Sequence, residues 1–569
     1  MRKTSLYLLA TPTASRKKAT LFTCILALLF SVLSIAWSAK LNPAEANTII
    51  YVNQNASGSN NGTTWKNAYT DLQTALAAAS SGDEIWVAAG IYVPGTNSFS
   101  SFSLVDGVAV YGGFDASETV RAQRDWVNNI TILSGDVGGD DTTDSNGVVL
   151  DPDDVVGTNI RNIVVGSNLT AATVLDGFTI TAGNDAFSGG TASGLALNSS
   201  SPTVQNIHFI GNKGLLGGGL SMSNSSSPQI ADIIIENNLA NSRGGGIYID
   251  NSSPTIQNVS IIGNESLSQG GGIYSVGSVI TLTNIAVQGN STTIDGGGIF
   301  LATGDNSVLD NILISGNIAS NNSGSEGGGL HIFDSDITIS NLTIVGNFAS
   351  LGGGIANNFG TLNLNNSIVW GNDDNGSNPE TASSYENFNA STNIQFSTVE
   401  SINTFQNSGN NSGSDPLFAS TINASDAPTT TGDFQLQSGS PAIDAGSSAL
   451  YTSASNTDLA GNTRINGSAI DMGVYESNFI PLSLAIDGSG SGSVSATGIN
   501  CPSDCEEGYA PNTVVTLTAT ADTGSNFITW SGASGCSNNR VCAVTMDSAK
   551  NITATIDLKN YTLGAAIIP

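Results

Sequence analysis

Residues 244–269 read GGGIYIDNSSPTIQNVSIIGNESLSQ, and this stretch decides the fold because its pattern recurs along the chain. Three glycines followed by Leu or Ile return five more times, and successive steps between the third glycines are 27, 26, 26, 31 and 25 residues. A nearly fixed period in this range indicates a repeat architecture. The third glycines are Gly219, Gly246, Gly272, Gly298, Gly329 and Gly354.

Two asparagine tracks keep the same spacing, which argues against a low-complexity linker. Glycine allows a positive φ at a coil corner, and stacked asparagines tolerate the left-handed region and can hydrogen-bond one another. We therefore interpret both tracks as structural. The first track, which follows Gly in most coils, includes Asn212, Asn264, Asn290, Asn317 and Asn347. The second comprises Asn206, Asp232, Asn258, Asn284, Asn311, Asn341 and Asn366.

Each repeat contains three short aliphatic runs, which in the quoted stretch are Ile247–Ile249, Thr255–Ile256 and Val259–Ile262. Short β-branched runs between Asn, Ser and Gly predict strands joined by turns. One coil of three strands cannot bury its aliphatic face alone, but stacked coils share a core. The sequence therefore predicts an all-β parallel β-helix solenoid, right-handed by the general preference for that crossover.

Composition and the first residues predict export. The net charge is −30 and only 11% of residues are charged, which disfavours binding to nucleic acid or anionic membranes. A basic stretch ending at Lys18 precedes an apolar run, Leu21–Trp37, and small residues, so residues 1–46 resemble a signal peptide. An uncleaved membrane anchor is the alternative. We expect a secreted or cell-surface protein, with the bacterial outer membrane as one location.

Residues 47–130 are predicted to form an N-terminal cap and the first coils. Asp71–Ala79 predicts a short amphipathic helix, and Ile49–Val52 and Ile85–Ala88 predict strands beside it. With Val110–Phe114 and Ile132–Asp136, the region resembles the cap of secreted bacterial pectin-lyase-like β-helix proteins. This resemblance implies the same fold.

Residues 131–174 contain a coil and an acidic insertion. Oxygen-rich clusters suit Ca²⁺, so Asp140, Asp141, Asp144 and Asn146 are candidate calcium ligands. A solvated acidic loop without an ion is the alternative. No other cofactor is expected.

Regular coils are predicted over residues 175–400, with irregular last coils and a C-terminal cap over 401–478. The regular part resembles polymorphic outer membrane protein repeats, which pair Gly-Gly-x-aliphatic with Phe-x-x-Asn, as in Phe209–Asn212. The cap resembles the closing segment of many secreted β-helix proteins, with Arg464 paired to carboxylates. The cap residues are Asp444, Asp458, Arg464, Asp471 and Glu476.

Residues 482–557 are predicted to form a separate β module that resembles internalin B-repeats, followed by a tail, 558–569. Cys501, Cys505, Cys536 and Cys542 lie in this module. Four cysteines in a small exported domain imply two disulfides with three possible connectivities. Pairing between sequence neighbours, Cys501–Cys505 and Cys536–Cys542, is favoured.

Catalytic signals are sparse. Lyases of this fold need a basic residue, yet Lys213 and Arg243 are the only Lys or Arg between residues 190 and 370. His208 and His331 are interpreted as structural, and hydrolysis needs two facing carboxylates, for which Asp232 and Glu236 are candidates. We therefore expect a non-catalytic exported adhesion, structural or glycan-binding protein whose partners are extracellular glycans or neighbouring cell surfaces. A polysaccharide lyase or glycoside hydrolase of the pectin-lyase-like fold is the alternative.

Overall fold

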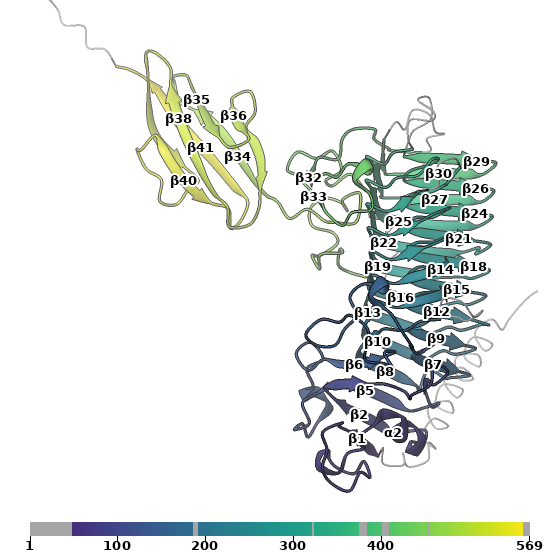
Figure 1. The fold of residues 1–569 in the computed structure, drawn as a ribbon. Helices are drawn as coiled ribbons and strands as arrows, with labels where there is room; N and C mark the ends of the chain where they lie inside the picture. The colour runs from purple at the N-terminus through teal and green to yellow at the C-terminus, as the bar shows by residue number, and fades with distance from the viewer. Residues whose placement is uncertain are drawn as a thin grey trace, which may run out of the picture. The chain divides into compact units, whose positions relative to one another are not determined.

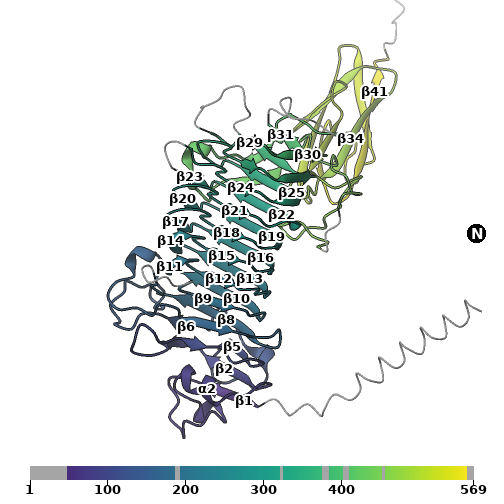
Figure 2. The same cartoon turned by 90° about the vertical axis from the view of Figure 1, so that its right-hand side faces the viewer.

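The computed structural model describes residues 48–185, 192–320, 324–374, 384–400, 409–451 and 455–560. Between residues 49 and 399 the chain forms a parallel β-helix whose coils stack on one another, as Figures 1 and 2 show. The predicted fold class is confirmed. The predicted signal peptide and most of the predicted tail lie outside the described residues. None of the described helices is long and apolar enough to cross a membrane.

The largest sheet, here called sheet A, takes a parallel strand from successive coils. Its main path contains β1 (Ile49–Val52), β2 (Glu84–Ala88), β5 (Ala109–Phe114), β8 (Val174–Thr181), β10 (Thr203–Ile210), β13 (Gln229–Glu236), β16 (Thr255–Ile262), β19 (Thr281–Gln288), β22 (Ser307–Ser315), β25 (Asp336–Val345), β27 (Thr361–Asn365) and β30 (Ser391–Gln395). Beside this path lie β3 (Gly90–Tyr92), β6 (Thr131–Ser134), β28 (Ile368–Trp370) and β31 (Thr398–Val399).

Two further parallel sheets, sheets B and C, complete the coils. Sheet B contains β4 (Phe102–Ser103), β7 (Val164–Ser167), β9 (Leu195–Asn198), β12 (Leu220–Ser223), β15 (Ile247–Asp250), β18 (Ile273–Val276), β21 (Ile299–Ala302), β24 (Leu330–Phe333), β26 (Ile355–Asn358) and β29 (Tyr385–Phe388). Sheet C contains β11 (Lys213–Leu216), β14 (Leu239–Arg243), β17 (Glu265–Ser266), β20 (Ser291–Thr292) and β23 (Ile318–Ala319).

The quoted stretch forms one coil from β15, β16 and β17. The prediction of two separate strands at Thr255–Ile256 and Val259–Ile262 is wrong, because both runs belong to β16. This strand bends at Asn258, whose φ is +54°. The left-handed residue breaks the simple alternation of side chains, so aliphatic residues on both sides of the bend reach the core.

The core is one continuous stack of aliphatic rows inside the coils. Ile247, Ile273 and Ile299 occupy the same register position in neighbouring strands of sheet B, and each is fully buried. Burial of one such side chain contributes roughly 1.5–3 kcal/mol. The repeat therefore stabilises the fold mainly by adding the same buried row to every coil.

A ladder of buried asparagines runs beside this core. The Nδ2 of Asn264 donates to the Oδ1 of Asn290 (3.0 Å) and to the carbonyl of Ile235 (2.9 Å), and its Oδ1 accepts from Asn238. Each amide thus forms hydrogen bonds with backbone and side-chain groups of neighbouring coils, as buried polar groups require. The ladder comprises Asn212, Asn238, Asn264, Asn290, Asn317, Asn347 and Asn372.

The glycine triplet forms a coil corner for two reasons. Gly244 has a φ of +67°, which glycine adopts without steric cost. A Cβ on Gly245 would lie 2.3 Å from the carbonyl oxygen of Gly271 in the next coil. The triplet therefore combines an unusual backbone conformation with close contact between coils.

The first coil is covered by the predicted helix, α2 (Leu72–Ala78). Asp71 caps it by accepting from the Thr74 N–H at 2.7 Å, and Leu72, Ala75 and Leu76 are buried against the core. The short 3₁₀ helices in the described part of the chain are η1 (Trp65–Asn67), η2 (Arg121–Gln123), η3 (Pro152–Asp154) and η5 (Ala424–Asp426).

The described part of residues 409–478, here called the cap segment, packs on the outward face of sheet A. It contains an antiparallel pair, β32 (Phe418–Ser420) and β33 (Asp433–Leu436), where the sequence suggested further irregular coils. Phe418, Phe434 and Met472 share a buried cluster with Leu313 and Ile368 of sheet A. The cap segment therefore covers part of this face.

Residues 480–558 form a module with its own core and two four-stranded sheets. One sheet contains β34 (Ile480–Asp487), β37 (Glu506–Tyr509), β39 (Ser525–Ser531) and β41 (Lys550–Leu558). The other contains β35 (Gly492–Ala496), β36 (Ile499–Cys501), β38 (Val514–Ala521) and β40 (Val541–Thr545). Disulfides join Cys501 to Cys505 and Cys536 to Cys542, the favoured pairing.

Candidate functional site

The outward face of sheet A is covered at two places and open between them. Near β10, Val148 packs against Ile210, and the carbonyl of Leu150 accepts from the Nδ2 of Asn237 at 3.3 Å. Near β25, the Val474 N–H of the cap segment donates to the Oγ1 of Thr343 at 2.9 Å. Between these contacts lie β13, β16 and β19, while β22 beside β19 is itself covered by the cap segment through Leu313.

We call the open part of this face the window and define it by side chains that point outward from these three strands. They are Ile234, Glu236, Ser260, Ile262, Ala286 and Gln288. All six are at least partly exposed, and Ile234 is 43% exposed, while Ala286 also packs against the buried cluster of the cap segment. Because strands in a sheet are about 4.8 Å apart, the three strands of the window span roughly 10 Å along the solenoid.

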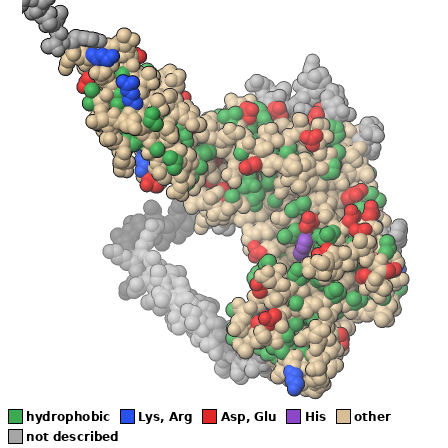
Figure 3. Space-filling view, turned by 60° about the vertical axis from the view of Figure 1, so that its left-hand side comes forward, with side chains coloured by type: hydrophobic (Ala, Val, Ile, Leu, Met, Phe, Trp, Pro, Cys, Tyr) green, Lys and Arg blue, Asp and Glu red, His purple; other side chains and the backbone are tan. Residues whose placement is uncertain are grey.

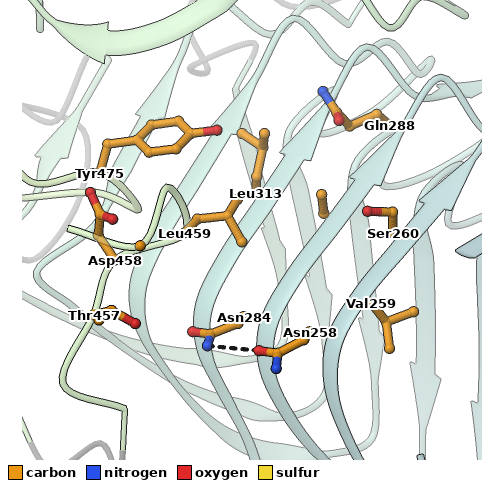
Figure 4. Close-up of a pocket in the computed structure, with 12 residues that line it drawn as sticks. Asn258, Val259, Ser260, Asn284, Gln288, Leu313, Thr457, Asp458, Leu459 and Tyr475 are labelled. Carbon is orange, nitrogen blue, oxygen red and sulfur yellow. Dashed lines mark hydrogen bonds between the residues drawn. The ribbon is translucent and has the colours of Figure 1, made fainter. Parts of the chain in front are cut away.

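A pocket of about 460 Å³ opens where the window meets the cap segment. Figure 4 shows Asn258, Asn284 and Gln288 on the strand side, with Asp458, Leu459 and Tyr475 on the cap side. Asn284 donates from Nδ2 to the Oδ1 of Asn258 at 3.0 Å, which fixes both amides. The lining thus combines oriented amides, hydroxyls, aliphatic groups and one aromatic ring.

Asp458 is the carboxylate that lines this pocket, and both of its oxygens are engaged. Oδ1 accepts from the Asn462 N–H at 2.7 Å, and Oδ2 accepts from the Glu476 N–H at 2.8 Å and from the Asn462 Nδ2 at 3.1 Å. Burial, followed by the charges of Asp433 and Asp458, raises the pKa of Tyr475. The pocket therefore offers hydrogen-bonding groups and a neutral phenol.

His208 and Glu236 form a pair at the other end of the window. The Nε2 of His208 lies 3.1 Å from the Oε2 of Glu236, and each side chain is about one-third exposed, at 32% and 34%. The hydrogen bond from His208 is the main cause that lowers the pKa of Glu236, and burial opposes it. Glu236 is therefore a carboxylate at neutral pH, and its orientation is fixed by the imidazole.

The other candidate residues of the central coils do not join this pair. Asp232 occupies the bend of β13 and accepts from the Nδ2 of Asn258 at 2.9 Å. Lys213 extends toward Asp153, with Nζ 3.3 Å from Oδ1, and Arg243 lies 5.1 Å over the ring of Tyr274. Among the described residues, no Lys or Arg lines the pocket. Figure 3 shows one face of the molecule, on which acidic side chains are more widespread than basic ones.

The acidic loop brings together only part of the predicted calcium set. Carboxylate oxygens of Asp136, Asp140 and Asp141 lie within 4.8 Å of one another. Asp144 instead accepts from the backbone N–H groups of Asn146 and Val148, both at 2.9 Å. Burial raises the pKa of Asp141. Calcium binding at this loop stays a prediction, with Asp136 added to the candidate ligands.

Acidic and basic side chains of the cap segment contact other residues of the same segment. Arg464 is 1% exposed, with Nη1 3.8 Å from the Oε2 of Glu476, and its Nη2 donates to the Gly473 carbonyl. Asp471 accepts from the Asp444 and Ser477 N–H groups, both at 2.6 Å. Burial, followed by the charge of Asp471, raises the pKa of Glu476 to about 8. These contacts hold the segment's loops together.

A second carboxylate cluster lies on sheet B, where the sequence analysis found no site. His331 points outward from β24 but is 3% exposed, and its Nε2 lies 3.4 Å from the Oε2 of Glu326. Burial lowers the pKa of His331 to about 4. Burial also raises the pKa values of Glu326 and Glu386, and the charge of Glu386 adds to the effect on Glu326. Glu386 lies on β29, two strands beyond β24 in sheet B, so no local spacing in the sequence indicates this grouping.

Two parts of the chain match known protein families. Residues 119–265 and 219–397 match the family described as right handed beta helix region. Residues 482–559 match the divergent InlB B-repeat domain. A comparison with curated proteins finds no match.

Two solved structures match this chain at low sequence identity and low TM-score. Pectate lyase Pel9A is 15% identical, with a TM-score of 0.32 and coverage of 76% of this chain and 96% of that chain. XylC, solved in complex with xylose, is 10% identical, with a TM-score of 0.31 and coverage of 76% and 99%. Similarity at this level carries no argument about activity.

Proposed function

Because the chain is a right-handed parallel β-helix protein with a C-terminal divergent InlB B-repeat domain, we propose that it is a non-catalytic exported surface protein that binds a neutral glycan in the window. The supporting observation is the pocket of about 460 Å³, which amides, hydroxyls and Tyr475 line without a cation. A volume of this size is within the usual range for small-molecule sites.

The chemistry of the lining favours a neutral sugar over a uronate. Amide and hydroxyl groups such as those of Asn258, Asn284, Ser260 and Gln288 exchange hydrogen bonds with sugar hydroxyls. Tyr475 adds an aromatic ring with a polar end. Asp458 would repel an anionic sugar, and no described cation of the lining would offset that repulsion.

The same geometry argues against catalysis in the window. Hydrolysis needs two carboxyl groups that flank the scissile bond, but both oxygens of Asp458 accept backbone hydrogen bonds. Glu236 is paired with His208, which is the single imidazole at this face in the described residues. The window therefore supports binding better than turnover.

Export has indirect support. Two disulfides occur in the module, and such bonds persist mainly outside the reducing cytosol. The acidic net charge of −30 and the N-terminal signal-like sequence agree with this location. Fractionation of the native cells with surface proteolysis would test it, and protein confined to the cytosol would contradict it.

The binding proposal is tested by calorimetric titration of the full chain with neutral oligosaccharides from xylan, mannan and β-glucan, alongside oligogalacturonate. We expect a neutral ligand to bind and Ser260→Trp, which fills the window, to abolish that binding. Gln229→Ala, an exposed change outside the window on β13, is the matched control. Binding of oligogalacturonate alone, or equal binding by Ser260→Trp, would contradict the proposal.

A glycoside hydrolase is a second candidate because of one observation, the raised pKa values of Glu326 and Glu386 on sheet B. A carboxyl group with a raised pKa suits a general acid. Release of reducing ends from a neutral polysaccharide, lost in Glu326→Gln but kept in Ser260→Trp, would favour this alternative. No release from any substrate of the panel would remove it.

A further inference from the structure

A second pocket lies at the start of the solenoid, away from the window. Its volume is about 540 Å³, and it lies between β2 and the loop around η2. The charged and tryptophan side chains that line it are Glu84, Trp86, Arg121, Arg124 and Trp126. The volume is again within the range of small-molecule sites.

Two tryptophans line this pocket, of which Trp126 is exposed and Trp86 is buried. Trp86 is 2% exposed and stacks on Phe114, with ring centroids 4.8 Å apart and an interplanar angle of 11°. Its Nε1 donates to the Oε2 of Glu84 at 2.8 Å. Trp126 is 40% exposed, which is unusual for so large an apolar side chain and leaves part of its indole available to a ligand.

The loop that carries Trp126 is held firmly on the solenoid. The Arg124 guanidinium lies 4.8 Å over the Trp126 ring and donates from Nη2 to the buried Asp176 at 2.5 Å. The Asp125 N–H donates to the Gly113 carbonyl at 2.7 Å. A Cβ on Gly113 would lie 2.7 Å from the Trp126 backbone, so the two segments are in close contact. The aromatic surface is therefore preorganised.

Both arginines are neutralised by a carboxylate. Arg121 donates from Nη1 to the Oε1 of Glu84 at 2.9 Å and to the Tyr111 hydroxyl at 2.8 Å, and Arg124 is paired with Asp176. The side chain of Arg121 is 47% exposed, so part of its guanidinium faces solvent beside the Glu84 carboxylate. The pocket thus offers adjacent donors and acceptors with no net charge among these four groups.

We propose that this pocket binds the ring of a neutral sugar, with its C–H face stacked on Trp126 and its hydroxyls hydrogen-bonded by Arg121 and Glu84. A guanidinium beside a carboxylate matches adjacent hydroxyls, each of which donates and accepts. The balanced charge disfavours a uronate or an amino sugar, since either would add an unpaired charge. This site is independent of the window and of the function proposed for it.

The test is a titration of the full chain with glucose, galactose, mannose, xylose and N-acetylglucosamine, and with glucuronate and glucosamine as charged comparators. Binding is followed by calorimetry and by tryptophan fluorescence, because Trp126 would report a stacked ring. At least one neutral sugar is expected to bind, and Trp126→Ala to weaken it about tenfold or more. Ala122→Trp fills the pocket from an exposed position and gives a second loss of binding with the indole of Trp126 retained.

Val127→Ala is the matched control, because Val127 is 71% exposed and does not line the pocket. Ser260→Trp in the window should leave binding at this pocket unchanged, so the two sites are tested separately. The proposal is overturned if no neutral sugar binds. It is also overturned if Ala122→Trp binds as well as the unchanged chain, or if a charged sugar binds more tightly than every neutral one.

Discussion

The regular coils and the cap segment bury polar groups in different ways. In the coils, neutral amides such as Asn264 repeat from one coil to the next and satisfy one another. In the cap segment, Arg464 and Glu476 are ionisable, occur once and are buried beside Asp471. We therefore expect the amide ladder of the coils to tolerate a wide pH range, whereas the cap segment depends on charge and on individual contacts.

The largest expected effect comes from removing the buried cation of the cap segment. Arg464→Ala breaks the contacts with Glu476 and the Gly473 carbonyl and should cost about 3–5 kcal/mol, as breaking a buried pair does. Limited proteolysis and denaturant unfolding should show release of residues 409–478 first. Arg540→Ala, an exposed change in the C-terminal module, is the control. Equal resistance of the two variants to proteolysis and denaturant would contradict the dependence of the cap segment on the Arg464 contacts.

The pH dependence of the cap segment is the next effect. The pKa of Glu476 is about 8 in the folded chain and about 4.3 in an unfolded one. Because the folded value is raised, the stabilisation is complete below about 4.3 and is lost as pH rises through 8. The free energy of unfolding of the cap segment should therefore fall across this pH range by a few kcal/mol at most. Glu476→Gln should flatten the profile, and an unchanged profile would contradict the assignment.

The buried amide ladder should give a large effect that does not depend on pH. Asn264→Ala removes donors to Asn290 Oδ1 and the Ile235 carbonyl, and it removes the acceptor used by Asn238. Leaving such groups buried and unpaired should cost about 2–3 kcal/mol. Denaturant unfolding at pH 5 and pH 8 should give the same loss. A loss that changes with pH would place a titrating group beside the ladder.

The asparagines at the bend of sheet A should matter less. Asn258 has a φ of +54° and donates to the exposed Asp232 carboxylate. Asn258→Ala should cost about 1–2 kcal/mol, because alanine resists the left-handed region. Asn258→Gly should recover much of this loss, since glycine adopts that conformation freely. Equal losses in the two variants would show that the side-chain hydrogen bonds of Asn258 with Asp232 and Asn284 dominate instead of backbone strain.

Calcium at the acidic loop is expected to give the smallest effect. If Asp136, Asp140 and Asp141 bind the ion, Ca²⁺ should raise the melting temperature slightly and a chelator should lower it. Asp140→Asn should remove the response, whereas Asp151→Asn, an exposed change in the same loop, should keep it. A melting temperature that does not change with Ca²⁺ would indicate that the loop is a solvated insertion without a bound ion.

Much of the solenoid could be predicted because a repeat shows the same physical constraint many times. The spacing of Gly246 and Asn264 identified the coils, and the amphipathic pattern after Asp71 identified α2. The bend at Asn258 was missed because two aliphatic runs separated by two polar residues, Gln257 and Asn258, resemble two strands. The cluster of Glu326, His331 and Glu386 was missed because these residues belong to different coils.

The amino-acid sequence alone identifies the parallel β-helix, its inward rows and the four-cysteine module, because periodic burial and local pairing are visible in one dimension. Where the cap segment covers sheet A, and which outward residues stay open, depends on contacts that form only in the folded chain. Outside the asparagine track, the outward rows of sheet A do not repeat one residue type: Ser260, Ala286 and Leu313 share one register row yet differ in chemistry. Both candidate sugar sites therefore depend on contacts between residues that lie far apart in the sequence, including Tyr475 against β19 and Trp126 against β5.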